Sequence, residues 1–155
     1  MNNKGHKIVL NEIYQNKVVW GQILNAIAMG HSDWLDIASK LYDVSDAGTA
    51  EALTLSVGEA ICNSPKEVLK LLAANPTTTL LAKNKSFNLI EVCSGVDIDD
   101  ERYDGLDLAL AEIAKRQQAL SSVSDLLYKE KRDECIHALE ASKSGILRFY
   151  GKADN

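Results

Sequence analysis

The sequence predicts an all-α protein, and three observations support this fold class. Leu, Ala, Glu and Lys, which favour helix, are abundant in the 155 residues, whereas proline occurs only twice. Apolar residues recur at three- and four-residue steps along most of the chain, and no segment alternates as a strand would. The length suits one compact domain. We therefore expect residues 1–155 to form a single domain of six or seven helices, packed as an irregular bundle or a short solenoid-like stack.

The first half of the chain contains four predicted helices. Apolar spacing predicts the first over 7–28, and Gly30 then ends it. The second and third cover 32–42 and 46–63, and each begins after a short polar connector. The fourth covers 64–74, and "NPTTT" then breaks it.

Helix-capping residues support two of these starts. In Ser64-Pro65-Lys66-Glu67 the serine is an N-cap, the proline occupies the first helical position and the glutamate completes a capping box. In the connector before the third helix, either Ser45 or Asp46 can cap the helix that follows.

The second half of the chain contains one short and two long predicted helices. The short helix covers 87–93 and is expected to be buried, and the long helices cover about 100–122 and about 124–142. The tail at 145–150 is expected to dock on the body through its apolar residues, which are Ile146, Leu147, Phe149 and Tyr150.

The net charge of −5 is concentrated in residues 97–107. This segment contains six acidic residues and one basic residue, whereas the rest of the chain has 16 of each and is neutral. The acidic residues are Asp97, Asp99, Asp100, Glu101, Asp104 and Asp107. An acidic protein is a poor general binder of nucleic acid or of anionic membranes, because both require a basic surface.

Two chemical interpretations of this acidic segment fail on its sequence. A calcium-binding loop of the EF-hand type, counted from Asp97, requires glycine at its sixth position and glutamate at its twelfth. The chain has Arg102 and Leu108 there. A catalytic carboxylate pair requires an apolar wall that raises the pKa of one acid, and this segment is polar throughout.

Two other interpretations of the acidic segment stay open. Acidic residues stabilise a helix start by about 0.3–1 kcal/mol each, so the segment can be the solvated start of the helix at 100–122. One or two acidic residues suffice for that role. The additional acidic residues favour a surface that docks a basic partner.

The sequence predicts no enzyme, no metal site and no cofactor. Its histidines, His6, His31 and His137, form neither HxxxH nor HExxH. Cys135 and His137 are one residue apart on a predicted helix and point to different sides, which disfavours zinc. Motifs for a nucleophilic serine, a phosphate-binding loop and a dinucleotide-binding turn are also missing from the sequence.

The three cysteines leave their redox state open. Cys93 and Cys135 flank the acidic segment, so a disulfide between them would tie its base to the last long helix. In the chain-entropy model that closure stabilises the fold by about 4 kcal/mol. The alternative is two separate buried cysteines. If the bond forms, Cys62 is the free thiol.

The sequence predicts no membrane span, because no apolar run approaches the ~20 residues that a span requires. The N-terminus also lacks the apolar core of a signal peptide. We therefore expect either a cytoplasmic protein or a mature exported protein whose leader has been removed.

Several stretches resemble a group of small exported all-helical bacterial proteins of no known activity. They are "VWGQILNAIAMGHSDWLDIASKLYDVSDAGTAEAL" (19–53), "SPKEVL" (64–69) and "EVC" (91–93), followed by Cys135. The resemblance implies a periplasmic location, a removed leader and a Cys93–Cys135 bridge. Members of that group have an apolar, proline-containing segment where this chain is acidic. In plan the chain also resembles the helical immunity proteins of bacterial toxin systems, which block an enzyme with an acidic or protruding loop.

These observations together predict a bacterial protein-interaction module. It would dock a basic or cleft-bearing protein through the acidic segment, and an immunity-type inhibitor is its specific form. The alternative is a structural or scaffold domain that forms a homo-oligomer through Trp20 and the apolar tail, because Trp20 lies near the edge of its apolar stripe.

Overall fold

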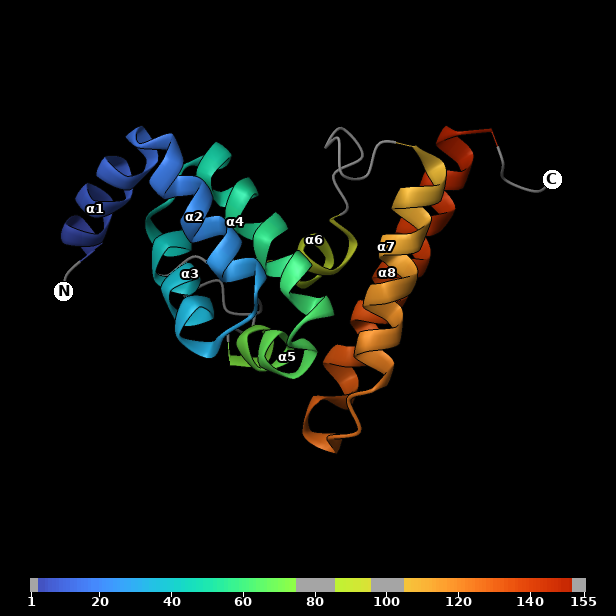
Figure 1. The fold of residues 1–155 in the computed structure, drawn as a ribbon. Coiled ribbons are helices and arrows are strands. Elements are labelled where there is room, and N and C mark those ends of the chain that lie inside the picture. Colours follow the sequence, from blue (N-terminus) through green and yellow to red (C-terminus); the bar gives the residue numbers. More distant parts are fainter. Residues whose placement is uncertain (1–2, 75–85, 96–104, 152–155) are drawn as a thin grey trace.

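The computed structural model describes residues 3–74, 86–95 and 105–151 of the chain. Within these ranges the chain forms eight α-helices and two short 3₁₀ helices, with no strand (Figure 1). The elements are α1 (Asn3–Gln15), α2 (Lys17–Ala28), α3 (Ser32–Val44), α4 (Ala47–Glu59), η1 (Ala60–Cys62), α5 (Pro65–Ala74), α6 (Leu89–Ser94), α7 (Leu106–Ser121), η3 (Leu126–Tyr128) and α8 (Lys129–Phe149). The predicted all-α class is confirmed for these residues, and the number of helices exceeds the expected six or seven.

The additional helix arises at Asn16, where the helix predicted over 7–28 divides into α1 and α2. Asn16 has an extended backbone (φ −92°, ψ 94°), and its side-chain oxygen accepts a hydrogen bond from the N–H of Val19 at 3.2 Å. Asparagine favours a helix start over a helix interior because its amide oxygen can satisfy a free N–H group. The apolar spacing continues across the break, so periodicity alone predicted one helix.

The helix predicted at about 100–122 begins later than expected, directly after Gly105. Gly105 has a φ of 102°, a conformation that favours glycine, and α7 begins directly after it at Leu106. The prediction of one helix from residue 100 is therefore wrong. Of the six acidic residues in the segment, Asp107 is the one that lies in the first turn of α7, where the helix dipole favours a negative charge.

The last helix is longer than its predicted range of 124–142. It continues to Phe149, so most of the expected tail forms the C-terminal turns of α8. No proline interrupts this stretch, and the single Gly145 weakens a helix without ending it. Ile146 packs into the core, whereas Phe149 is 73% exposed.

The helices form two packed groups that meet along α5, α6 and η1 (Figure 1). Helices α1 to α5 make one group, and α7 and α8 lie side by side in opposite directions to make the other. Helix α6 contacts both α4 and α8, and η1 contacts α7. Buried apolar side chains form a core that extends through both groups and includes Ile27, Leu53, Ile113 and Leu139.

Trp20 is part of this core. It is 6% exposed, and its ring meets that of Tyr14 edge-on with the centroids 5.7 Å apart. Although Trp20 lies near the edge of its apolar stripe in the sequence, its side chain belongs to the core and is not available on the surface. A self-association surface cannot rest on this side chain.

Helices α4 and α6 approach each other closely at Gly58. A Cβ atom at this position would lie 2.5 Å from the carbonyl oxygen of Val92 and 3.1 Å from Nη1 of Arg116. The end of a flexible side chain could move away from the added atom, but a backbone carbonyl oxygen within a helix cannot. The missing side chain of Gly58 therefore allows both the spacing of the two helices and the position of Arg116.

Replacement of Gly58 by alanine should lower the free energy of unfolding by about 1–3 kcal/mol, because the added methyl group forces α4 and α6 apart. Gly21 provides the matched control. It lies within α2, and a Cβ atom there meets nothing within 4 Å. Gly21→Ala should therefore stabilise the protein by about 0.5–1 kcal/mol. Urea denaturation measures both changes, and an equal effect of the two variants would contradict a constraint at Gly58.

Candidate functional site

The end of α6 is held against α8 immediately before the acidic segment. The sulfur atoms of Cys93 and Cys135 lie at disulfide distance, and their Cα atoms are 5.2 Å apart. Both cysteines are fully buried. The carbonyl oxygen of the next residue, Ser94, accepts a hydrogen bond from the hydroxyl of Ser142 at 3.1 Å. The structure thus brings together the two cysteines that the resemblance implied as a pair.

Arg116 of α7 holds the end of α6 from the other side. Its side chain is 1% exposed, and its Nη1 donates a hydrogen bond to the carbonyl oxygen of Gly95 at 3.0 Å. Its Nε donates to Oε1 of Glu112 at 2.9 Å. A buried guanidinium stays charged and needs such partners. Its positive charge also lies at the C-terminal end of α6, where the helix dipole favours it.

The sequence analysis did not identify Arg116 or Glu112. The only signal for this pair is the four-residue spacing of an acid and a base on one predicted helix. That spacing is typical of exposed helix surfaces, where such pairs contribute little. The pair is buried because η1 packs on α7 and because Gly58 and Gly95 lie against Arg116, and these contacts between distant segments are not revealed by the local sequence.

A groove opens between α4 and α6 beside this held end. Its volume is about 410 Å³. It is lined by Tyr42, Ala47, Ala50, Glu51, Thr54, Leu55, Glu91, Ser94 and Gly95. Two of these residues are acidic and none is basic. Gly95 is the last described residue before the acidic segment, which begins two positions later at Asp97.

The structure describes one of the six predicted docking residues. Asp107 is exposed in the first turn of α7. The other five lie outside the described residues; they are Asp97, Asp99, Asp100, Glu101 and Asp104. The groove on α4 and α6 was not predicted, since its lining comes from three separate parts of the chain.

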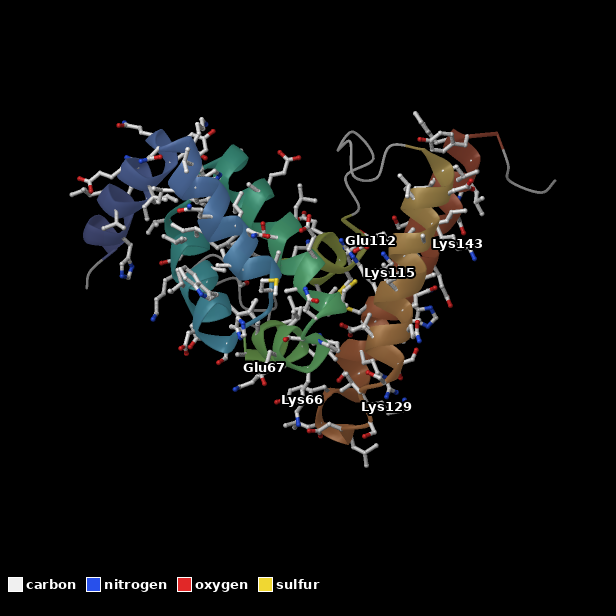
Figure 2. The ribbon with its side chains drawn as sticks, viewed as in Figure 1. Lys66, Glu67, Glu112, Lys115, Lys129 and Lys143 are labelled. Atoms are coloured by element: carbon white, nitrogen blue, oxygen red, sulfur yellow. A yellow bond between two sulfur atoms is a disulfide. The ribbon has the colours of Figure 1, made fainter. Side chains whose placement is uncertain are left out.

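Two paired lysines lie at the opposite end of the molecule from the start of α7. Lys66 and Lys129 are both found there (Figure 2). Lys66 pairs with Asp125 at 3.0 Å and Lys129 pairs with Asp133 at 2.6 Å, so local acids already compensate both charges. Neither lysine lines the groove.

Cys62 is a thiol beside the Arg116–Glu112 pair. Its Sγ donates a hydrogen bond to Oε1 of Glu112 at 3.5 Å. The residue lines two cavities of about 240 and 400 Å³, and Lys115 lines both with it; Figure 2 shows Glu112 and Lys115 together on α7. Burial, followed by the charge of Glu112, raises the pKa of the Cys62 thiol to about 11. Because the thiolate is the reactive form, Cys62 is a weak nucleophile at neutral pH.

Among the described residues, no group of three or more His, Cys, Asp or Glu side chains is placed to hold a metal ion. None of the helices in the described ranges is long and apolar enough to cross a bilayer. No family model, curated protein or solved structure matches the chain. The features that the structure does assemble are a fixed helix end, a groove with two acids and an exposed acid on α7.

Replacement of Arg116 by methionine should lower the free energy of unfolding by about 3–5 kcal/mol, because Glu112 is then buried without its cation. Adding Glu112→Gln should recover part of that loss, since it removes the uncompensated charge. Arg148→Met, at an exposed position on α8, is the control and should change stability by at most about 0.5 kcal/mol. Urea denaturation of the wild type, the single variants Arg116→Met and Glu112→Gln and the double variant gives the coupling, and fully additive effects would show that the pair does not act as a unit.

Alkylation under denaturing, non-reducing conditions should modify Cys62 alone if the Cys93–Cys135 bond forms. Intact mass measures the number of adducts, and three adducts without reduction would contradict the bond.

In the folded protein, Cys62 should react slowly with an alkylating reagent near neutral pH and faster as the pH rises towards its pKa of about 11. Glu112→Gln should speed the reaction at a given pH, because it removes a negative charge that opposes thiolate formation.

Proposed function

We propose that this protein is a non-enzymatic interaction module that docks a basic partner protein through its acidic 97–107 segment. The observation that carries the proposal is the concentration of the whole net charge of −5 in this segment. Asp107 lies in the first turn of α7, and one or two acids suffice to stabilise a helix start, so that role does not explain a segment with six acids. Dense exposed charge attracts an oppositely charged partner over a distance and selects against partners of like charge.

The held end of α6 supports this role. Contacts from Ser142 and Arg116 fix the backbone carbonyls of Ser94 and Gly95, the last two described residues before the segment. A segment that starts from a fixed point loses less conformational freedom on binding than one that starts from a mobile point. The scaffold therefore favours docking at this place on the surface.

The specific form that we propose is an immunity-type inhibitor of a bacterial toxin, with a basic or cleft-bearing enzyme as the partner. The helical scaffold and its acidic segment suit that role by analogy of architecture. We further propose that the protein works in the periplasm. The buried cysteine pair at disulfide distance supports an oxidising compartment, where such a bond persists.

Replacement of Asp97, Asp99 and Asp100 together by asparagine should slow association with the partner by about tenfold at low salt. It should also flatten the dependence of the association rate on ionic strength, because salt screens attraction between exposed charges. The partner is first identified as a protein that the wild type retains and the triple variant does not. Association rates are then measured over a series of salt concentrations, and unchanged kinetics would refute the docking role.

A control variant with the same change in net charge is Glu12→Gln, Asp36→Asn and Glu130→Gln, since these three acids are exposed on other helices. It should associate at nearly the wild-type rate.

Sedimentation at low protein concentration tests the alternative of a self-associating scaffold. A monomer is expected, and a stable homo-oligomer would favour the alternative.

A further inference from the structure

The groove between α4 and α6 combines apolar, aromatic and acidic groups. Ala47 and Ala50 of α4 contribute small apolar side chains, and Tyr42 of α3 contributes an aromatic ring. Glu51 of α4 and Glu91 of α6 contribute one carboxylate from each of the two helices. A ligand in this groove therefore meets acidic, aromatic and small apolar residues.

The two carboxylates are not compensated within the part of the chain that the structure describes. Glu51 and Glu91 are exposed, and neither makes an ion pair with any described residue. None of the described residues that line the groove is basic. The charge that this groove lacks is a positive one, so its complement is a cationic group.

We infer that this groove binds an arginine side chain of the partner protein, an inference that rests on the docking role proposed above. The guanidinium group is planar and always charged, donates hydrogen bonds to carboxylates and stacks on aromatic rings. Its methylene stem packs against small apolar side chains. Two carboxylates, a tyrosine ring and two alanines match each part of this side chain.

The size and rigidity of the groove suit this ligand. Its volume of about 410 Å³ lies near the lower end of the roughly 300–1,000 Å³ typical of small-ligand sites. Gly58 sets the spacing of α4 and α6, and the ring of Tyr42 packs against the ring of the buried Phe87 at a tilt of 34°, with the centroids 4.2 Å apart. A groove that is already formed needs little rearrangement to bind its ligand.

Titration of the ¹⁵N-labelled protein with Nα-acetyl-arginine methylamide tests the inference by NMR. We expect saturable shifts of the amide signals of Ala50, Glu51, Glu91 and Ser94. The same titration with Nα-acetyl-citrulline methylamide should give much weaker binding, because citrulline has nearly the same shape without the charge. Equal binding of the two probes, or shifts spread over the whole acidic surface, would overturn the inference.

Variants of the groove sharpen this test. Glu51→Gln with Glu91→Gln should weaken arginine binding by about fivefold, since it removes two ionic contacts. Ala50→Leu should also weaken it, by filling the groove without changing the charge. Glu12→Gln with Asp36→Asn changes the net charge equally outside the groove and should have no effect. Undiminished binding in both groove variants would contradict the inference.

The inference and the docking role can fail separately. The variant with asparagine at 97, 99 and 100 leaves the groove intact, so the arginine probe should still bind there. If the probe binds and the rate of association with the partner is unchanged in the asparagine variant, the proposed docking role is wrong. If the segment controls partner association and the probe does not bind in the groove, the arginine subsite fails alone.

Discussion

The buried guanidinium of Arg116 is the interaction on which the arrangement of the central helices depends. It belongs to α7, donates a hydrogen bond to the end of α6 and lies against α4 at Gly58. A charged group removed from water is costly unless it is fully partnered, so these three helices cannot separate without leaving the charge or its partners unsatisfied. Glu112, one turn away on α7, compensates the charge.

The stability of helix α6 depends on these contacts with its neighbours. The helix has six residues, too few to be stable as an isolated helix. Its buried Val92 and Cys93 pack into the core, Cys135 lies at disulfide distance, and the positive charge of Arg116 lies at its C-terminal end. Tertiary contacts therefore supply the stability that the short sequence of α6 lacks, and they define where the acidic segment begins.

The local signals in the sequence were reliable where a single residue controls the backbone. Gly30 has the positive φ of 77° that suits the end of α2, Pro65 is the first residue of α5, and Asp46 forms a capping box with Thr49. Predictions were wrong where the pattern ran on across a break. The apolar spacing continues past Asn16, and the helical composition continues past Gly105, although neither residue has a helical backbone.

In the candidate site, too, the sequence predicts the features that depend on neighbouring residues and does not predict those that depend on packing between distant segments. The charge of the 97–107 segment is a property of its composition, so the sequence revealed it completely. The groove contains residues of α3, α4 and α6, which come together only when the helices pack. The acids of the groove, Glu51 and Glu91, are 40 positions apart and gave no pattern to detect.

The sequence by itself determined the all-α class, several helix ends and the place of the net charge, because each depends on neighbouring residues and on composition. Only the tertiary structure decided that Arg116 is buried, that Trp20 belongs to the core, that Cys93 meets Cys135 and that α4 and α6 enclose an acidic groove. These features depend on which helix faces approach each other. That choice is made by side-chain packing between distant segments, and no short stretch of sequence contains it.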